Sequence, residues 1–179
     1  MTDWSRNVIH VVQGQCVVSN DPDVVLLTVL GSCVAACLFD PVRRVGGMNH
    51  FLLPEGKDPG DIRHASAAME RLVDSLLEKG AVRRDLRAKL FGGARIVPGL
   101  PDIGGRNGTA ALEFLESEGI PCTASHLGGN RARQIRFWPT TGRVEMLLLD
   151  EAEPPVEPPR RPAPASGGVE SLCLSSSRG

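Results

Sequence analysis

The sequence predicts an α+β domain, a layered sandwich of mixed β-sheet with two amphipathic helices packed on one face. Three observations support this fold class. The composition, 41% hydrophobic and 23% charged residues, is typical of a folded domain. Short runs rich in Val and Leu alternate with turn residues along most of the chain, and two further stretches have helical spacing without a regular βαβ alternation.

The strands are predicted from the short apolar runs and the turns that bound them. Asp40-Pro41 closes one such run, and Gly46-Gly47 allows a bulge or a close backbone approach within another. The predicted strands cover residues 8–18, 24–30, 34–39, 44–53, 86–91, 120–127, 134–138 and 143–149.

Two helices are predicted from a period close to 3.6 residues. The first follows residue 61, with Met69, Leu72 and Leu76 on its apolar face, and Gly80 is placed to end it in a left-handed conformation. The second is predicted to start at Asn107 as its N-cap and to stop at Gly119. This arrangement gives two helices to cover one sheet.

A change in composition divides the chain in two. Residues 1–150 are predicted to form the folded domain. Residues 151–179 hold six of the 14 prolines and a Ser-rich end. Such a segment buries too little apolar surface to offset its ordering entropy, so it is predicted to be a flexible tail.

Charge and cysteine content exclude several functional classes. A net charge of −1 provides no field for binding nucleic acid or an anionic membrane. No run is apolar for long enough to span a bilayer, and the N-terminus lacks the pattern of a signal peptide.

The five scattered cysteines indicate reduced thiols in a cytoplasmic protein. No metal-ligand spacing and no P-loop occur, so neither a metal nor a cofactor is expected.

The strongest chemical signal is Gly31-Ser32-Cys33, which lies between two apolar runs. A thiol at such a junction can be held near the surface, where the N–H groups of Ser32 and Cys33 could stabilise an oxyanion. His50 lies 17 residues (50 − 33) further on, and thiol catalysis needs an imidazole to move the proton. The competing interpretation is that the cysteine is a small buried hydrophobe, as we expect for Cys37, which alternation places on the same strand face.

Several blocks together resemble the CheD family, the chemoreceptor glutamine deamidases of bacterial chemotaxis. The opening block is LTVLGSCVAACLFDP at residues 27–41. Further blocks follow in order, namely GGMNHFLLP at 46–54, KLFGGA at 89–94, IGGRN at 103–107, EGIP at 118–121, LGGN at 127–130 and RF at 136–137. The resemblance covers most of the predicted domain and implies a CheD-like cysteine hydrolase fold.

The resemblance also implies roles for particular residues. Cys33 matches the nucleophile of the family and His50 its general base. The orienting Thr of some members falls six residues before the cysteine, at Leu27, whereas this sequence has Thr28 five residues before it. We assign the orienting role to Thr28, although alternation places Leu27 and Thr28 on opposite strand faces. The turn itself, rather than the resemblance, makes Gly31 and Ser32 candidates for the oxyanion hole and for substrate positioning.

The activity implied is that of a protein-glutamine glutaminase. It would convert receptor glutamines to glutamates with release of ammonia through a thioester, in support of chemotactic adaptation. His50 is expected to lower the pKa of Cys33 by forming an ion pair with the thiolate. The implied partners are the cytoplasmic helical region of methyl-accepting chemotaxis receptors and a CheC-type phosphatase. Three alternatives remain open, namely a crosslinking or proteolytic thiol enzyme, a non-catalytic chemotaxis adaptor, and a fold whose thiols are only core.

Overall fold

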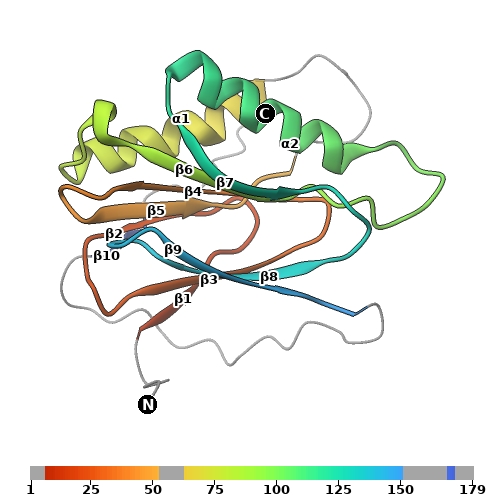
Figure 1. Ribbon diagram of the computed structural model, residues 1–179, viewed down its shortest axis with the longest axis horizontal. Coiled ribbons are helices and arrows are strands. Elements are labelled where there is room, and N and C mark those ends of the chain that lie inside the picture. Colours follow the sequence, from red (N-terminus) through yellow and green to blue (C-terminus); the bar gives the residue numbers. More distant parts are fainter. Residues whose placement is uncertain (1–6, 53–62, 151–168, 172–179) are drawn as a thin grey trace.

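The computed structural model describes residues 7–52, 63–150 and 169–171, and within it the chain forms three layers. Two helices cover one face of a six-stranded sheet, and a four-stranded sheet packs against its other face (Figure 1). The α+β class and the placement of both helices on one face are confirmed. The elements are β1 (Val8–His10), β2 (Cys16–Ser19), β3 (Val25–Leu30), β4 (Val34–Asp40), β5 (Val45–Asn49), α1 (Arg63–Glu78), η1 (Arg83–Asp85), β6 (Arg87–Gly92), α2 (Ile103–Glu118), β7 (Cys122–Leu127), β8 (Arg133–Trp138), β9 (Arg143–Leu148) and β10 (Val169–Ser171).

Both sheets are mixed. The four-stranded sheet has the order β1-β3-β8-β9, and only its β1–β3 pair is parallel. The six-stranded sheet has the order β10-β2-β5-β4-β6-β7, and only its β6–β7 pair is parallel. Consecutive strands β3 and β4 therefore belong to different sheets, so the short segment between them crosses the sandwich.

Alternation along β4 builds both layers of the core. Val34, Ala36 and Leu38 pack toward the helices, where α1 contributes Met69, Leu72 and Leu76. Ala35, Cys37 and Phe39 face the four-stranded sheet. A strand covered on both faces needs apolar residues at every position, which explains its uninterrupted apolar run.

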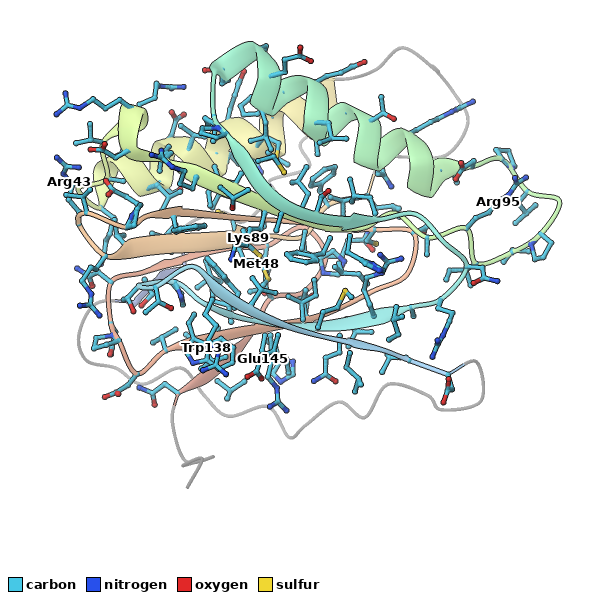
Figure 2. The ribbon with its side chains drawn as sticks, in the orientation of Figure 1. Arg43, Met48, Lys89, Arg95, Trp138 and Glu145 are labelled. Carbon is cyan, nitrogen blue, oxygen red and sulfur yellow. The ribbon has the colours of Figure 1, made fainter. Side chains whose placement is uncertain are left out.

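The layer between the two sheets contains Met48, which Figure 2 shows in the middle of the molecule. Cys33 packs against the same cluster as Cys37, so the prediction that both cysteines share a face is confirmed.

The predicted strand over residues 8–18 is wrong. β1 and β2 lie in different sheets, and residues 11–15 form the turn that joins them, with Gly14 at φ +88°. Val11 is buried while Val12 and Gln13 are exposed. The apolar composition of the segment hid this turn, because its valines favour a strand and Gly14 is a single turn residue.

The predicted N-cap at Asn107 is also wrong. α2 begins four residues earlier, and the Asp102 carboxylate caps it by accepting a hydrogen bond from the Gly105 N–H at 2.9 Å. Asn107 is fully buried within the helix, and its Nδ2 donates to the Ser32 carbonyl at 2.9 Å. Gly104 and Gly105 weakened the helical pattern, although Gly119 ends the helix at φ +65° as expected.

The glycine pair in β5 allows the close packing that its sequence suggested. A Cβ on Gly46 would lie 2.3 Å from the Pro139 carbonyl oxygen, and one on Gly47 would lie 2.8 Å from the Val17 carbonyl oxygen. Side chains at these positions would push β5 away from its neighbours.

The structure describes only part of the predicted tail. Val169–Ser171 form β10, which pairs antiparallel with β2 and extends the six-stranded sheet, so these three residues are part of the fold. The remainder of residues 151–179, Cys173 included, lies outside the described residues. Among the helices of the described part, none is both long and apolar enough to span a membrane.

Candidate active site

Cys33 lies in the segment that crosses from one sheet to the other. Leu30 ends β3 and Val34 begins β4, so residues 31–33 lie at one end of the sandwich. The Ile96 side chain lies 3.4 Å from where a Cβ on Gly31 would be, so the crossing segment is close to residues 95–96. Figure 2 marks this end of the sandwich by Arg95, and the β4–β5 turn at the opposite end by Arg43. The Cys33 side chain is half-buried and thus reachable from solvent.

All three carbonyl groups of this crossing segment accept hydrogen bonds from the same side. The Gly31 carbonyl accepts from the Ala94 N–H at 3.0 Å and the Cys33 carbonyl from the Gly93 N–H at 2.8 Å. The Ser32 carbonyl accepts from Asn107 Nδ2. In a trans peptide the N–H points opposite to the C=O. The N–H groups of Ser32 and Cys33 therefore point away from residues 93–94 and α2, and the Cys33 N–H contacts its own thiol.

Glycines make this close packing possible. Gly92 has φ +113°, and a Cβ on it would lie 2.1 Å from the Cys33 carbonyl oxygen. On the other side of this segment, a Cβ on Gly104 would lie 2.4 Å from the Ala94 carbonyl oxygen. Residues 92–94 are thus held between the Cys33 backbone and the first turn of α2.

A β-bridge places His50 beside Cys33. The backbones of Val34 and Phe51 exchange hydrogen bonds of 3.0 and 2.9 Å, and both side chains face the helices. Cys33 and His50, each one residue earlier, therefore share the opposite face, toward the four-stranded sheet. They are diagonal neighbours on adjacent strands, a relation in which Cα atoms lie roughly 7–8 Å apart.

The hydrogen bonds of the His50 ring define its tautomer. Nδ1 lies 2.9 Å from the Thr28 hydroxyl oxygen and 3.2 Å from the Val11 carbonyl oxygen. Thr28 uses its only proton to donate to that same carbonyl at 2.7 Å. Both partners are thus acceptors toward Nδ1, so Nδ1 carries the proton and the neutral ring has a lone pair on Nε2. Nε2 is buried and has no hydrogen-bond partner within the described ranges.

Strand alternation distinguishes Thr28 from Leu27. Leu26 and Leu30 pack in the layer between the sheets, so Thr28 faces that layer and reaches His50. Leu27 faces the other side of the four-stranded sheet. The geometry therefore favours Thr28, five residues before the cysteine, as the partner of the imidazole.

The turn at residues 11–15 also holds the His50 backbone, and nothing in the sequence had suggested this. The Gly14 N–H donates to the His50 carbonyl at 2.8 Å, and the His50 N–H donates to the Gln15 carbonyl at 3.1 Å. From the same turn, Gln13 Oε1 lies 3.8 Å from Cys33 Sγ. The sequence of this segment predicts a strand, so only its long-range contacts in the structure reveal that it binds His50 and approaches Cys33.

Burial favours the neutral forms of both groups. It raises the pKa of the Cys33 thiol above its ordinary value of 9.0, against a smaller lowering by its own backbone N–H. Burial also lowers the pKa of His50 below its ordinary value of 6.5, against a smaller raising by the Val11 carbonyl. The expected lowering of the Cys33 pKa by an ion pair with His50 is therefore wrong, and the resting pair is a thiol with a neutral imidazole.

A second glycine pair and a buried arginine support residues 92–94 from the far side. The Gly128 N–H donates to the Gly92 carbonyl at 2.9 Å, and Gly128 and Gly129 both have positive φ. Arg133 is 1% exposed and donates to the carbonyls of His126 and Gly128. Arg106 lies on α2, and its N–H donates to the Asp102 carbonyl at 3.3 Å.

We expect Gly92→Ala to destabilise the protein far more than Gly80→Ala. Both glycines have φ above +100°, so both substitutions incur backbone strain of about 1–3 kcal/mol. Gly80 has nothing within 4 Å of an added Cβ, whereas at Gly92 the Cys33 carbonyl must move. Denaturant unfolding of the two variants measures the difference. Equal losses of unfolding free energy would show that the contact with Cys33 is unimportant.

We expect Cys33 to react with iodoacetamide in a single pH step centred above 9.0, since burial penalises the thiolate and only the thiolate is nucleophilic. Peptide mass spectrometry after timed alkylation follows Cys33 separately from the exposed Cys122. Rapid, pH-independent alkylation of Cys33 between pH 6 and 8 would instead demonstrate a thiolate–imidazolium pair.

Comparisons with known proteins agree on one family. The family model described as CheD chemotactic sensory transduction matches residues 52–147, a segment that begins after Cys33 and His50. The curated relatives that the chain matches include three proteins that each carry the name "Probable chemoreceptor glutamine deamidase CheD". The one from Caulobacter sp. (strain K31) is 52% identical over 161 residues, 88% of this chain and 85% of that protein. The relative from Caulobacter vibrioides is 50% identical over 171 residues, which cover 90% of this chain and 91% of that protein. The relative from Cereibacter sphaeroides is 48% identical over 167 residues, which cover 91% of this chain and 84% of that protein.

One solved structure, Bacillus licheniformis hypothetical protein YfiH, has a TM-score of 0.44 with 16% identity, covering 65% of this chain and 50% of that one, a likeness too weak to support a conclusion. The family model, by contrast, covers more than half of the chain, and the curated relatives are about 50% identical over most of its length. The chain belongs to the CheD family.

Proposed function

We propose that this protein is a cytoplasmic protein-glutamine glutaminase that converts glutamine side chains of chemoreceptors to glutamate and releases ammonia. The single observation that carries the proposal is the arrangement of the His50 ring, with Nδ1 bound by Thr28 and Val11 and Nε2 free on the face shared with Cys33. The names of the curated relatives support the choice of substrate. Residues 1–150 would form the deamidase domain.

The first half of the reaction forms a thioester. As Cys33 Sγ attacks the carboxamide carbon, His50 Nε2 takes the thiol proton, and the C–S bond forms. The N–H groups of Ser32 and Cys33 would hold the resulting oxyanion. The His50 imidazolium then gives its proton to the nitrogen, the C–N bond breaks, and ammonia leaves.

The second half returns the enzyme to its starting state. His50 takes a proton from water, and the hydroxide attacks the thioester carbon. The C–S bond breaks, and the thiolate recovers the proton from His50. The balance is glutamine plus water giving glutamate plus ammonia, and no cofactor enters.

Exposed apolar side chains on a loop beside the crossing segment support a helical protein substrate. Ile96, Val97 and Leu100 are each about half exposed, on the loop whose Ile96 packs beside Gly31. Such a loop can contact the apolar side chains of a receptor helix while its glutamine reaches Cys33. Each conversion would add one negative charge to the receptor and create a glutamate for methylation-based adaptation.

We expect Thr28→Val to lower kcat about tenfold, while Thr28→Ser retains near wild-type activity. Valine keeps the shape but leaves His50 Nδ1 with only the longer bond to the Val11 carbonyl, a loss of roughly 1–1.5 kcal/mol in orientation. Rates of ammonia release from a receptor fragment measure the effect. An unchanged kcat in the valine variant would remove Thr28 from the machinery.

Mass spectrometry of a chemoreceptor cytoplasmic fragment tests the function itself. The wild-type protein is expected to convert specific glutamines to glutamates, and the Cys33→Ala variant is expected to convert none. Cys122→Ala is the matched control, because it removes an exposed thiol far from His50 in the sheet order and is expected to keep full activity. Binding of the fragment without conversion by the wild-type protein would favour the adaptor instead.

A further inference from the structure

Gln13 places an amide oxygen at the candidate nucleophile. Its Oε1 lies 3.8 Å from Cys33 Sγ, and the side chain is exposed, so it lies on the open side of the thiol. The thiol is neutral at rest, and a neutral S–H donates, so the oxygen of Gln13 is the acceptor. No step of the proposed mechanism uses this residue.

The position of Gln13 is fixed by the backbone that holds His50. Val11 binds the imidazole through its carbonyl, and Gly14 and Gln15 bind the His50 main chain. Gln13 lies between these residues, so the backbone on both sides of it is anchored to His50. An acceptor anchored in this way can position a substrate as well as contact a thiol.

A carboxamide substrate needs an acceptor at this place. Its carbonyl oxygen would face the N–H groups of Ser32 and Cys33, which directs its NH₂ group to the other side of the thiol. The NH₂ group brings two donors, and in the proposed mechanism His50 Nε2 takes up the thiol proton during the attack. The oxygens of Val11 and Thr28 are already engaged with His50 Nδ1. Among the contacts of the described residues, Gln13 Oε1 supplies an acceptor within reach of the thiol.

We propose that Gln13 determines specificity for the carboxamide by accepting a hydrogen bond from the substrate NH₂ group as Cys33 attacks. This inference rests on the proposed deamidase function and deepens it. The bond selects an amide over an ester of the same glutamyl side chain, because an ester has no N–H to donate. The choice between an amide and an ester is then made at the leaving group of the substrate, independently of contacts with the surrounding receptor surface.

Gln15 provides a matched control within the same turn. It is the same residue type two positions further on, but its Oε1 accepts from the Val12 N–H at 3.1 Å and so serves the turn itself. Methionine is similar in length to glutamine and lacks the acceptor. Gln13→Met and Gln15→Met therefore compare a proposed substrate contact with a structural one.

The experiment measures kcat/KM on two forms of one receptor peptide, the glutamine form and the γ-p-nitrophenyl ester of the glutamate form. Both give the same thioester, so kcat/KM compares the steps up to acylation. We expect Gln13→Met to lower kcat/KM on the glutamine peptide about 5–10-fold, the loss of one hydrogen bond, and to leave the ester within about twofold. Gln13→Glu keeps an acceptor and should keep the wild-type ratio of the two substrates. Gln15→Met should change both rates alike.

Each outcome decides a separate question. If Gln13→Met lowers both rates equally, or neither, Gln13 does not select the carboxamide and the inference fails while the deamidase proposal stands. If the wild-type protein cleaves the ester but never the glutamine peptide, the proposed function fails, and the inference falls with it. A change in the ratio confined to Gln13→Met supports both.

Discussion

The hydrogen bonds at His50 Nδ1 join three segments that lie far apart in the sequence, and the rest of the candidate site depends on them. Thr28 comes from the four-stranded sheet, Val11 from the turn between β1 and β2, and His50 from the residue that follows β5 in the other sheet. Because Thr28 spends its proton on the Val11 carbonyl, both neighbours can only accept from the ring. The fold thereby fixes which imidazole nitrogen is free to act as a base.

Burial gives this pair a different resting state from that of thiol enzymes with a preformed ion pair. A half-buried thiol and a buried imidazole both lose solvation when charged, so each stays neutral. A neutral thiol reacts slowly with electrophiles and oxidants, since the thiolate is the reactive species. In the proposed mechanism, the proton moves only when a substrate carbonyl accepts the sulfur and its oxyanion meets the N–H groups of the crossing segment. The reactivity of Cys33 would then be coupled to substrate binding.

The backbone around Cys33 is held on one side, and in the proposed mechanism its other side would face the substrate. The three carbonyls of the crossing segment accept hydrogen bonds from Asn107, Gly93 and Ala94. Glycines at positions 92 and 104 allow these backbones to pack closely. Gly128 binds the Gly92 carbonyl, and Arg133 in turn binds the Gly128 carbonyl. The glycine pairs at residues 92–93, 104–105 and 128–129 thus form one connected support. Close contact explains the residue type at Gly104, and positive φ explains it at residues 92–93 and 128–129.

The sequence by itself predicted the α+β class with both helices on one face, most strand positions and the shared face of Cys33 and Cys37. Its resemblance to a family also predicted that Cys33 works with His50. These features follow from periodicity, turn residues and motif order, all of which are local. Only the tertiary structure decided that Thr28 rather than Leu27 meets the imidazole, that residues 11–15 are a turn around His50, and that Asn107 binds Ser32 instead of capping α2. It also decided the protonation of the pair, against the expected thiolate. The physical reason is that hydrogen bonds across the sandwich and the loss of solvation depend on which residues pack around a group. Those residues are distant in the sequence, so the neighbouring residues in the sequence do not predict them.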